Sequence, residues 1–86
     1  ARPAAPAAPG APLSGAQLRA AQKDLAAVDR RLAKLAEQIE AKHHQLADHD
    51  QSDHVGLAAL TRELRALEAE VAEQESRWLE LSELVE

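Results

Sequence analysis

Residues 57–85 read LAALTRELRALEAEVAEQESRWLELSELV, and this stretch decides the fold. Its mostly apolar side chains recur at alternating steps of three and four, a set called here the second seam: Leu57, Leu60, Leu64, Leu67, Val71, Gln74, Trp78, Leu81 and Val85. Such a heptad repeat has a period of about 3.5 residues, against roughly 3.6 in an α-helical turn. A helix that carries it must supercoil around a partner helix to keep the seam covered.

The partner helix is expected within the same chain. A first seam with the same spacing precedes the second one and comprises Leu18, Ala21, Leu25, Val28, Leu32, Leu35, Ile39, Lys42 and Leu46. Residues 48–54 (DHDQSDH) separate the two seams and are rich in side chains that favour turns and helix caps. Because this connection is short, the second helix is expected to return antiparallel to the first.

The predicted fold class is all-α, an antiparallel two-helix coiled-coil hairpin over residues 14–86. The first helix is expected at about 14–48, the turn at 49–53 and the second helix at 54–86. Ser14 and Gln17 have the spacing of a capping box at the start of the first helix. Either Asp53 or Ser52 is expected to cap the second helix.

Residues 1–13 (ARPAAPAAPGAPL) carry a proline at every third position from Pro3 to Pro12. Proline removes a backbone donor and biases its predecessor toward extended geometry, so the sequence predicts a disordered, flexible Pro/Ala-rich linker. A proline-motif ligand is the less favoured interpretation, because only Arg2 offers a basic anchor.

Two registers of the hairpin satisfy the repeat. In the first, Trp78 faces Ala21 and Lys42 faces Leu57. In the second, Trp78 faces Val28 and Lys42 is carried inward against Leu64. The first is preferred, because it sets the bulkiest side chain against the smallest and leaves the Lys42 ammonium near the turn, where it can reach water.

The composition excludes several classes of protein. The chain contains no cysteine, no phosphate-binding glycine loop and no metalloprotease motif, so neither an enzyme nor a cofactor is expected in these residues. No apolar run is long enough to cross a bilayer, and residues 1–13 lack the pattern of a signal peptide, which favours a cytoplasmic location without membrane contact. The absence of any Met suggests a piece of a longer protein.

Potential metal ligands gather only around the turn. The set comprises His43, His44, His49, His54, Asp48, Asp50 and Asp53. Their spacing follows no fixed ligand pattern, so solvated turn and cap residues are the favoured interpretation and no metal site is predicted.

Positive side chains line the side of the first helix that faces away from its seam. This basic stripe comprises Arg19, Lys23, Arg30 and Lys34, with Arg31 at its edge. Such a row could follow a phosphate backbone without reading bases. In a chain of net charge −5, an ordinary solvated face is the favoured interpretation from composition alone, with Asp24 and Glu37 as balancing charges. The single aromatic residue, Trp78, is interpreted as a seam anchor rather than a base-stacking platform.

Three further stretches carry a family resemblance. LADHD at residues 46–50, LTRELRALEAE at 60–70 and ESRWLEL at 75–81 follow a Pro/Ala-rich linker and a leucine-rich helix. Together they resemble the C-terminal domain of ABC-F ATPases, in particular the Uup-like branch, over nearly all of the chain beyond the linker.

The resemblance implies a non-catalytic coiled-coil hairpin appended to a parent ATPase whose ATP-binding cassettes lie upstream. It implies that this domain helps the parent engage nucleic acid, either branched DNA or ribosomal RNA. The basic stripe, Arg19, Lys23, Arg30, Arg31 and Lys34, is then the expected contact surface. The alternative is a structural or protein-interaction module that docks on the parent cassettes or self-associates, and a monomer is expected.

Overall fold

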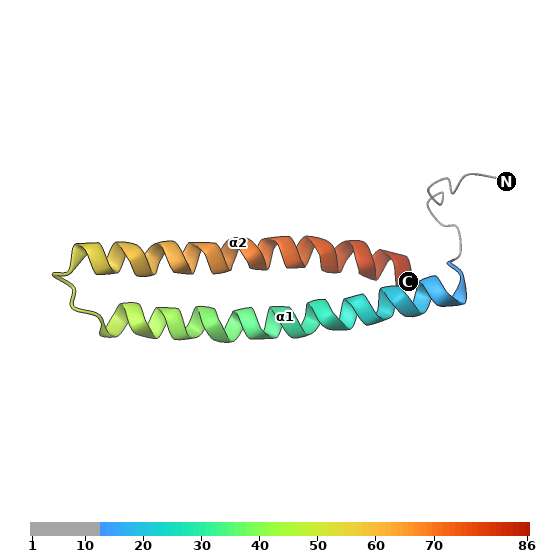
Figure 1. The fold of residues 1–86 in the computed structure, drawn as a ribbon, viewed down its shortest axis with the longest axis horizontal. Coiled ribbons are helices and arrows are strands. Elements are labelled where there is room, and N and C mark those ends of the chain that lie inside the picture. The colour runs from blue at the N-terminus through green and yellow to red at the C-terminus, as the bar shows by residue number, and fades with distance from the viewer. Residues whose placement is uncertain (1–12) are drawn as a thin grey trace.

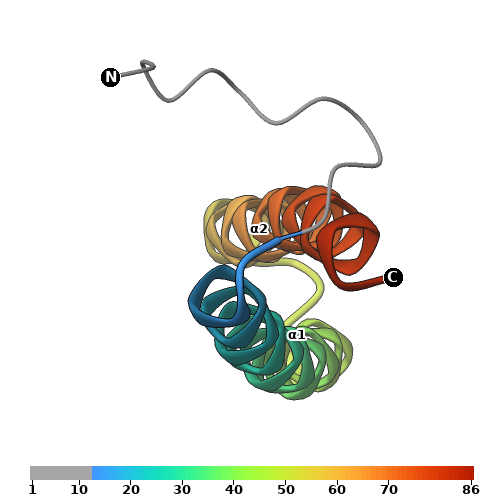
Figure 2. The same ribbon diagram turned by 90° about the vertical axis from the view of Figure 1, so that its right-hand side faces the viewer.

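The computed structural model describes residues 13–86, which form two long helices joined by a tight turn (Figure 1). Helix α1 covers Gly15–Asp48 and helix α2 covers His54–Val85. The helices run antiparallel, side by side, and viewed end-on they cross rather than lie exactly parallel (Figure 2). The predicted all-α hairpin is confirmed. The predicted linker lies outside the described residues, except for Leu13.

Both helices begin at residues that can satisfy free backbone amides. The Ser14 hydroxyl accepts from the Gln17 amide at 3.1 Å, and the Gln17 side chain accepts from the Ser14 amide at 2.9 Å. The predicted capping box is therefore confirmed. At the start of α2 the Asp53 carboxylate accepts from the Gly56 amide at 3.0 Å, so Asp53 rather than Ser52 is the N-cap.

The core is the line where the two seams meet. Its buried members are Ala21, Val28 and Leu35 on α1 and Leu64 and Leu81 on α2. Every other seam residue is partly buried, and Leu35 is fully enclosed. Trp78 packs against the cluster of Ala21, Val28 and Leu81, which confirms its interpretation as a seam anchor.

The register is the second of the two alternatives, so the preference for the first was wrong. Leu81 shares a cluster with Val28, and the Trp78 indole donates to Asp29, the neighbour of Val28. In the first register Trp78 would face Ala21, about 12 Å along the helix from Asp29 at roughly 1.5 Å per residue. Val28, rather than Ala21, therefore faces Trp78 across the seam.

Lys42 shows how the observed register tolerates a charge in the seam. Its side chain is only 15% exposed, yet its ammonium reaches Glu63 Oε1 at 2.7 Å and Gln45 Oε1 at 3.1 Å. The aliphatic part of a lysine can cover apolar surface while its charged end leaves the seam. The Lys42 ammonium therefore donates to the Glu63 carboxylate instead of projecting into water at the turn.

Candidate nucleic-acid interface

Four members of the basic stripe project from one outer side of α1. Arg19, Lys23, Arg30 and Lys34 are all exposed. The helical rise of about 1.5 Å per residue spreads them over roughly 22 Å. None of the four forms an ion pair with another residue in the range 13–86. No ion pair within the described residues neutralises their charges.

Arg31 lies in a different environment from the other four. Its Nε donates to Glu70 Oε2 at 2.5 Å and its second guanidinium nitrogen donates to Glu70 Oε1 at 2.7 Å, which makes a two-pronged bridge to α2. These hydrogen bonds lower the pKa of Glu70 and raise the pKa of Arg31, because each favours the charged form. Arg31 therefore joins the helices, and the sequence offered no distinction between it and Arg30.

Asp24, the neighbour of Lys23 in the stripe, is also engaged across the helices. Asp24 Oδ2 lies 3.8 Å from a guanidinium nitrogen of Arg77. Asp24, Arg31 and Lys42 thus each meet an opposite charge from α2 along one flank of the hairpin. We call this side the paired flank. Arg77 partly offsets the negative charge of Asp24 beside the stripe, although such exposed pairs add little to stability.

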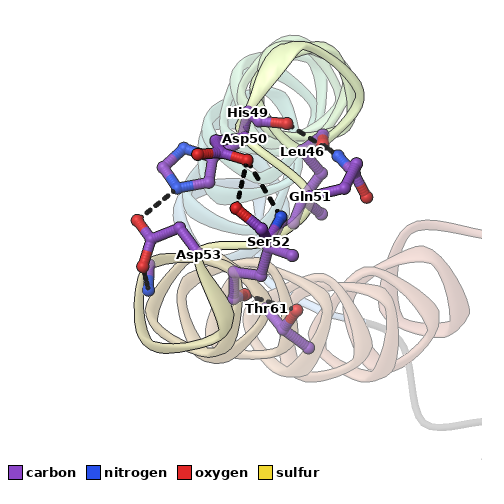
Figure 3. Close-up of polar contacts among 9 residues, drawn as sticks. Leu46, His49, Asp50, Gln51, Ser52, Asp53 and Thr61 are labelled. Atoms are coloured by element: carbon purple, nitrogen blue, oxygen red, sulfur yellow. Dashed lines mark hydrogen bonds and ion pairs between the residues drawn. The ribbon is translucent and has the colours of Figure 1, made fainter.

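The turn is held by short-range polar contacts (Figure 3). Asp50 Oδ1 accepts from the Ser52 amide at 2.9 Å and the Ser52 hydroxyl at 2.7 Å, and the Gln51 side chain donates to the Leu46 carbonyl at 3.0 Å. The hydrogen bonds from Ser52 lower the pKa of Asp50. These side chains act as turn-forming groups, in agreement with the favoured interpretation.

His49 and Asp53 form the polar bridge across the turn, with Nε2 and Oδ2 at 2.8 Å (Figure 3). The Gly56 amide, and then His49, lower the pKa of Asp53. A side chain at position 56 would place its Cβ 2.5 Å from His49 Nε2, so only glycine leaves room for this bridge. Across residues 13–86 no group of three or more potential ligands is arranged to hold a metal ion.

The flank opposite the paired flank carries a groove that the sequence did not predict. There Asp29, Leu32, Glu75, Trp78 and Leu79 line a groove of about 430 Å³, called here the Trp78 groove. The Trp78 Nε1–H donates to Asp29 Oδ1 at 2.7 Å along its edge. The signal that could have revealed it is Leu79, a large apolar residue outside the seam that is 57% exposed.

Comparison with known proteins yields one family. The model of the ABC transporter C-terminal domain matches residues 17–83, which span both helices and the turn. Searches among curated proteins and among solved structures gave no match. In the part of the chain that the structure describes, neither helix is apolar enough over a sufficient length to cross a membrane.

Proposed function

Because the chain belongs to the ABC transporter C-terminal domain family, we propose that this accessory domain of an ABC protein contacts nucleic acid through the basic stripe on α1. The observation that carries the proposal is the row of four exposed cations without ion-pair partners in residues 13–86. Backbone phosphates are the complementary ligand, since a helix side with cations over about 22 Å can follow a strand without entering a groove.

The parent protein in this proposal is an ABC-F ATPase of the Uup-like branch, located in the cytoplasm. Its ATP chemistry takes place in cassettes upstream, while the hairpin itself performs no reaction and needs no cofactor. The nucleic acid is branched DNA or ribosomal RNA. The net charge of −5 opposes binding by the isolated chain. Attachment to the cassettes raises the effective concentration of the stripe near its target, which compensates for weak intrinsic affinity.

The test is a titration of the chain with duplex DNA, branched DNA and structured RNA at low salt. We expect binding that weakens as salt rises, with a logarithmic slope of about −0.9 for each duplex phosphate neutralised. The variant Arg30→Glu/Lys34→Glu should weaken binding to every sequence and reduce that slope by about 2.

The matched control is Arg62→Glu/Arg65→Glu, two exposed arginines on α2 that lie outside the stripe. It changes the net charge by the same amount, so it separates the stripe from overall charge. Equal effects of the two double variants, or no binding to any of the three nucleic acids, would refute the proposal. Circular dichroism on each variant verifies that the helices remain intact.

Within the stripe, the bridge to Glu70 predicts unequal contributions. Arg30→Ala should weaken binding more than Arg31→Ala, because Arg31 already gives its donors to Glu70. Glu70→Ala should then increase the affinity by releasing Arg31. An affinity lowered as much by Arg31→Ala as by Arg30→Ala would show that the bridge opens when nucleic acid binds.

A further inference from the structure

The two flanks of the hairpin differ in the charges that line the helix junction. On the paired flank, side chains from α1 and α2 meet in ion pairs, as in Arg31–Glu70 and Arg77–Asp24, and hollows remain beside these pairs. On the other flank, the Trp78 groove combines three apolar side chains with two carboxylates. Leu79 is 57% exposed there, beside Trp78, the single Phe, Tyr or Trp residue of the chain. Apolar side chains bordered by polar groups are found in protein-docking sites.

The charges that border the Trp78 groove are negative. Asp29 uses Oδ1 to accept from the Trp78 indole, which leaves Oδ2 available. Glu75 forms no ion pair or side-chain hydrogen bond with another residue of the described range 13–86. Two carboxylates beside an apolar surface complement a ligand that presents one apolar side chain and one positively charged side chain next to each other.

The shape of the groove further restricts its occupant. It lies at the junction of α1 and α2, so a third helix packed into that junction would cover it. Ala26 and Ala33 on α1 and Ala72 on α2 fall on this side by heptad position, and all three are exposed. Their small side chains leave space for a helix to approach.

We propose that the Trp78 groove docks a helix of a partner protein that presents a leucine-sized side chain beside a Lys or Arg. The apolar side chain packs against Leu32, Trp78 and Leu79, and the cation meets Glu75 and the free oxygen of Asp29. The groove carries the opposite charge to the basic stripe, so the two surfaces favour ligands of opposite charge. One hairpin would thus bind nucleic acid through its cations and a partner helix through the Trp78 groove.

The probe for this inference is a helical peptide of about 20 residues with leucines at positions i and i+4 and lysines that flank them on the same face. The control peptide has glutamate in place of each lysine. Titration into the full chain is followed through the indole N–H resonance and the fluorescence of Trp78, the single tryptophan. We expect saturable changes with the lysine peptide and at least tenfold weaker binding of the glutamate peptide.

Variants of the chain localise the effect. Glu75→Lys and Leu79→Ser should each weaken the lysine peptide about tenfold, and Glu73→Lys, which alters an exposed glutamate outside the groove, should not. Absence of a Trp78 response, or equal binding of the two peptides, would overturn the proposal. So would a Trp78 signal that changes with protein concentration, since a second copy would then fill the groove. A signal that changes in Arg2→Glu would instead identify the chain's own first residues as the occupant.

Discussion

The half of the hairpin next to the turn and the half at its open end are stabilised in different ways. At the open end Ala21, Val28 and Leu81 form a buried cluster that is extended by Trp78 and Val85. Next to the turn, Leu35 and Leu64 are buried, but the seam also admits Lys42. Polar contacts add to the packing there, among them the Asp53 cap, the bridge to His49 and the pair between Lys42 and Glu63.

The difference follows from chain connectivity. The turn already holds the two helix ends together, so short-range hydrogen bonds suffice to fix their geometry. The open end has no covalent link nearby, and its helices stay together only if packing offsets the conformational entropy of separation. Packing between the seams is therefore required to hold the open end together.

The largest expected effect is loss of the open-end cluster. Leu81→Ala removes a buried side chain and leaves a cavity beside Val28, so the free energy of unfolding should fall by about 2–5 kcal/mol. Urea denaturation followed by circular dichroism measures it. The control, Leu79→Ala, truncates a half-exposed leucine two positions away and should change stability by at most about 0.5 kcal/mol. Similar losses in both variants would contradict the assignment of the core.

Lys42→Leu should make the turn half resemble the open half. The substitution places an apolar side chain at a seam position that is 15% exposed, and it leaves Glu63 in contact with solvent. We expect the free energy of unfolding to rise by about 1 kcal/mol, because a leucine buries apolar surface in the seam while the exposed Glu63 loses an ion pair that contributes little. Lys42→Ala, which removes the ammonium without adding apolar volume, is the control. A loss of stability in Lys42→Leu would mean that its pair with Glu63 contributes more than burial.

Much of the fold was predictable because its signals are local in sequence. The heptad spacing gives both helices and the sides they bury, and the capping box at Ser14 depends on residues three positions apart. The choice of Asp53 over Ser52 as N-cap, by contrast, depends on the backbone path of the turn. Asp50 accepts two hydrogen bonds from Ser52 and commits that residue to the turn.

The register could not be deduced from the repeat, because the two alternatives differ by one heptad and both keep the seams in contact. The preference for Trp78 against Ala21 relied on side-chain volume alone, and it was wrong. A contact far from the turn distinguishes the two alternatives, namely the hydrogen bond from the Trp78 indole to Asp29. These two residues are 49 positions apart, so a repeat of seven residues does not predict their contact.

In the candidate sites, too, features within one helix could be predicted from the sequence, whereas contacts between the two helices could not. Heptad positions alone placed Arg19, Lys23, Arg30 and Lys34 on one outer side, since that arrangement depends only on helical geometry. The engagement of Arg31 by Glu70 joins residues on different helices and could not be read from spacing. The Trp78 groove likewise combines residues from both helices, so it emerged only from the structure.

The smallest expected effect is local and depends on pH. The pKa of Asp53 lies below its ordinary value of 3.8, first because the Gly56 amide donates to it and second because of His49. A carboxyl group with a lowered folded-state pKa stabilises the fold above its unfolded-state pKa, and this contribution is lost as the pH falls through the folded-state value. Below about pH 4 the Gly56 amide resonance should therefore shift before the amide resonance of Leu81, which lies in the open-end cluster. Asp53→Asn keeps a capping side chain that does not titrate, so the early Gly56 shift should disappear in it. If both resonances instead move together in the original chain, the turn and the open end respond to acid as one cooperative unit, and the two halves differ in composition without differing in local stability.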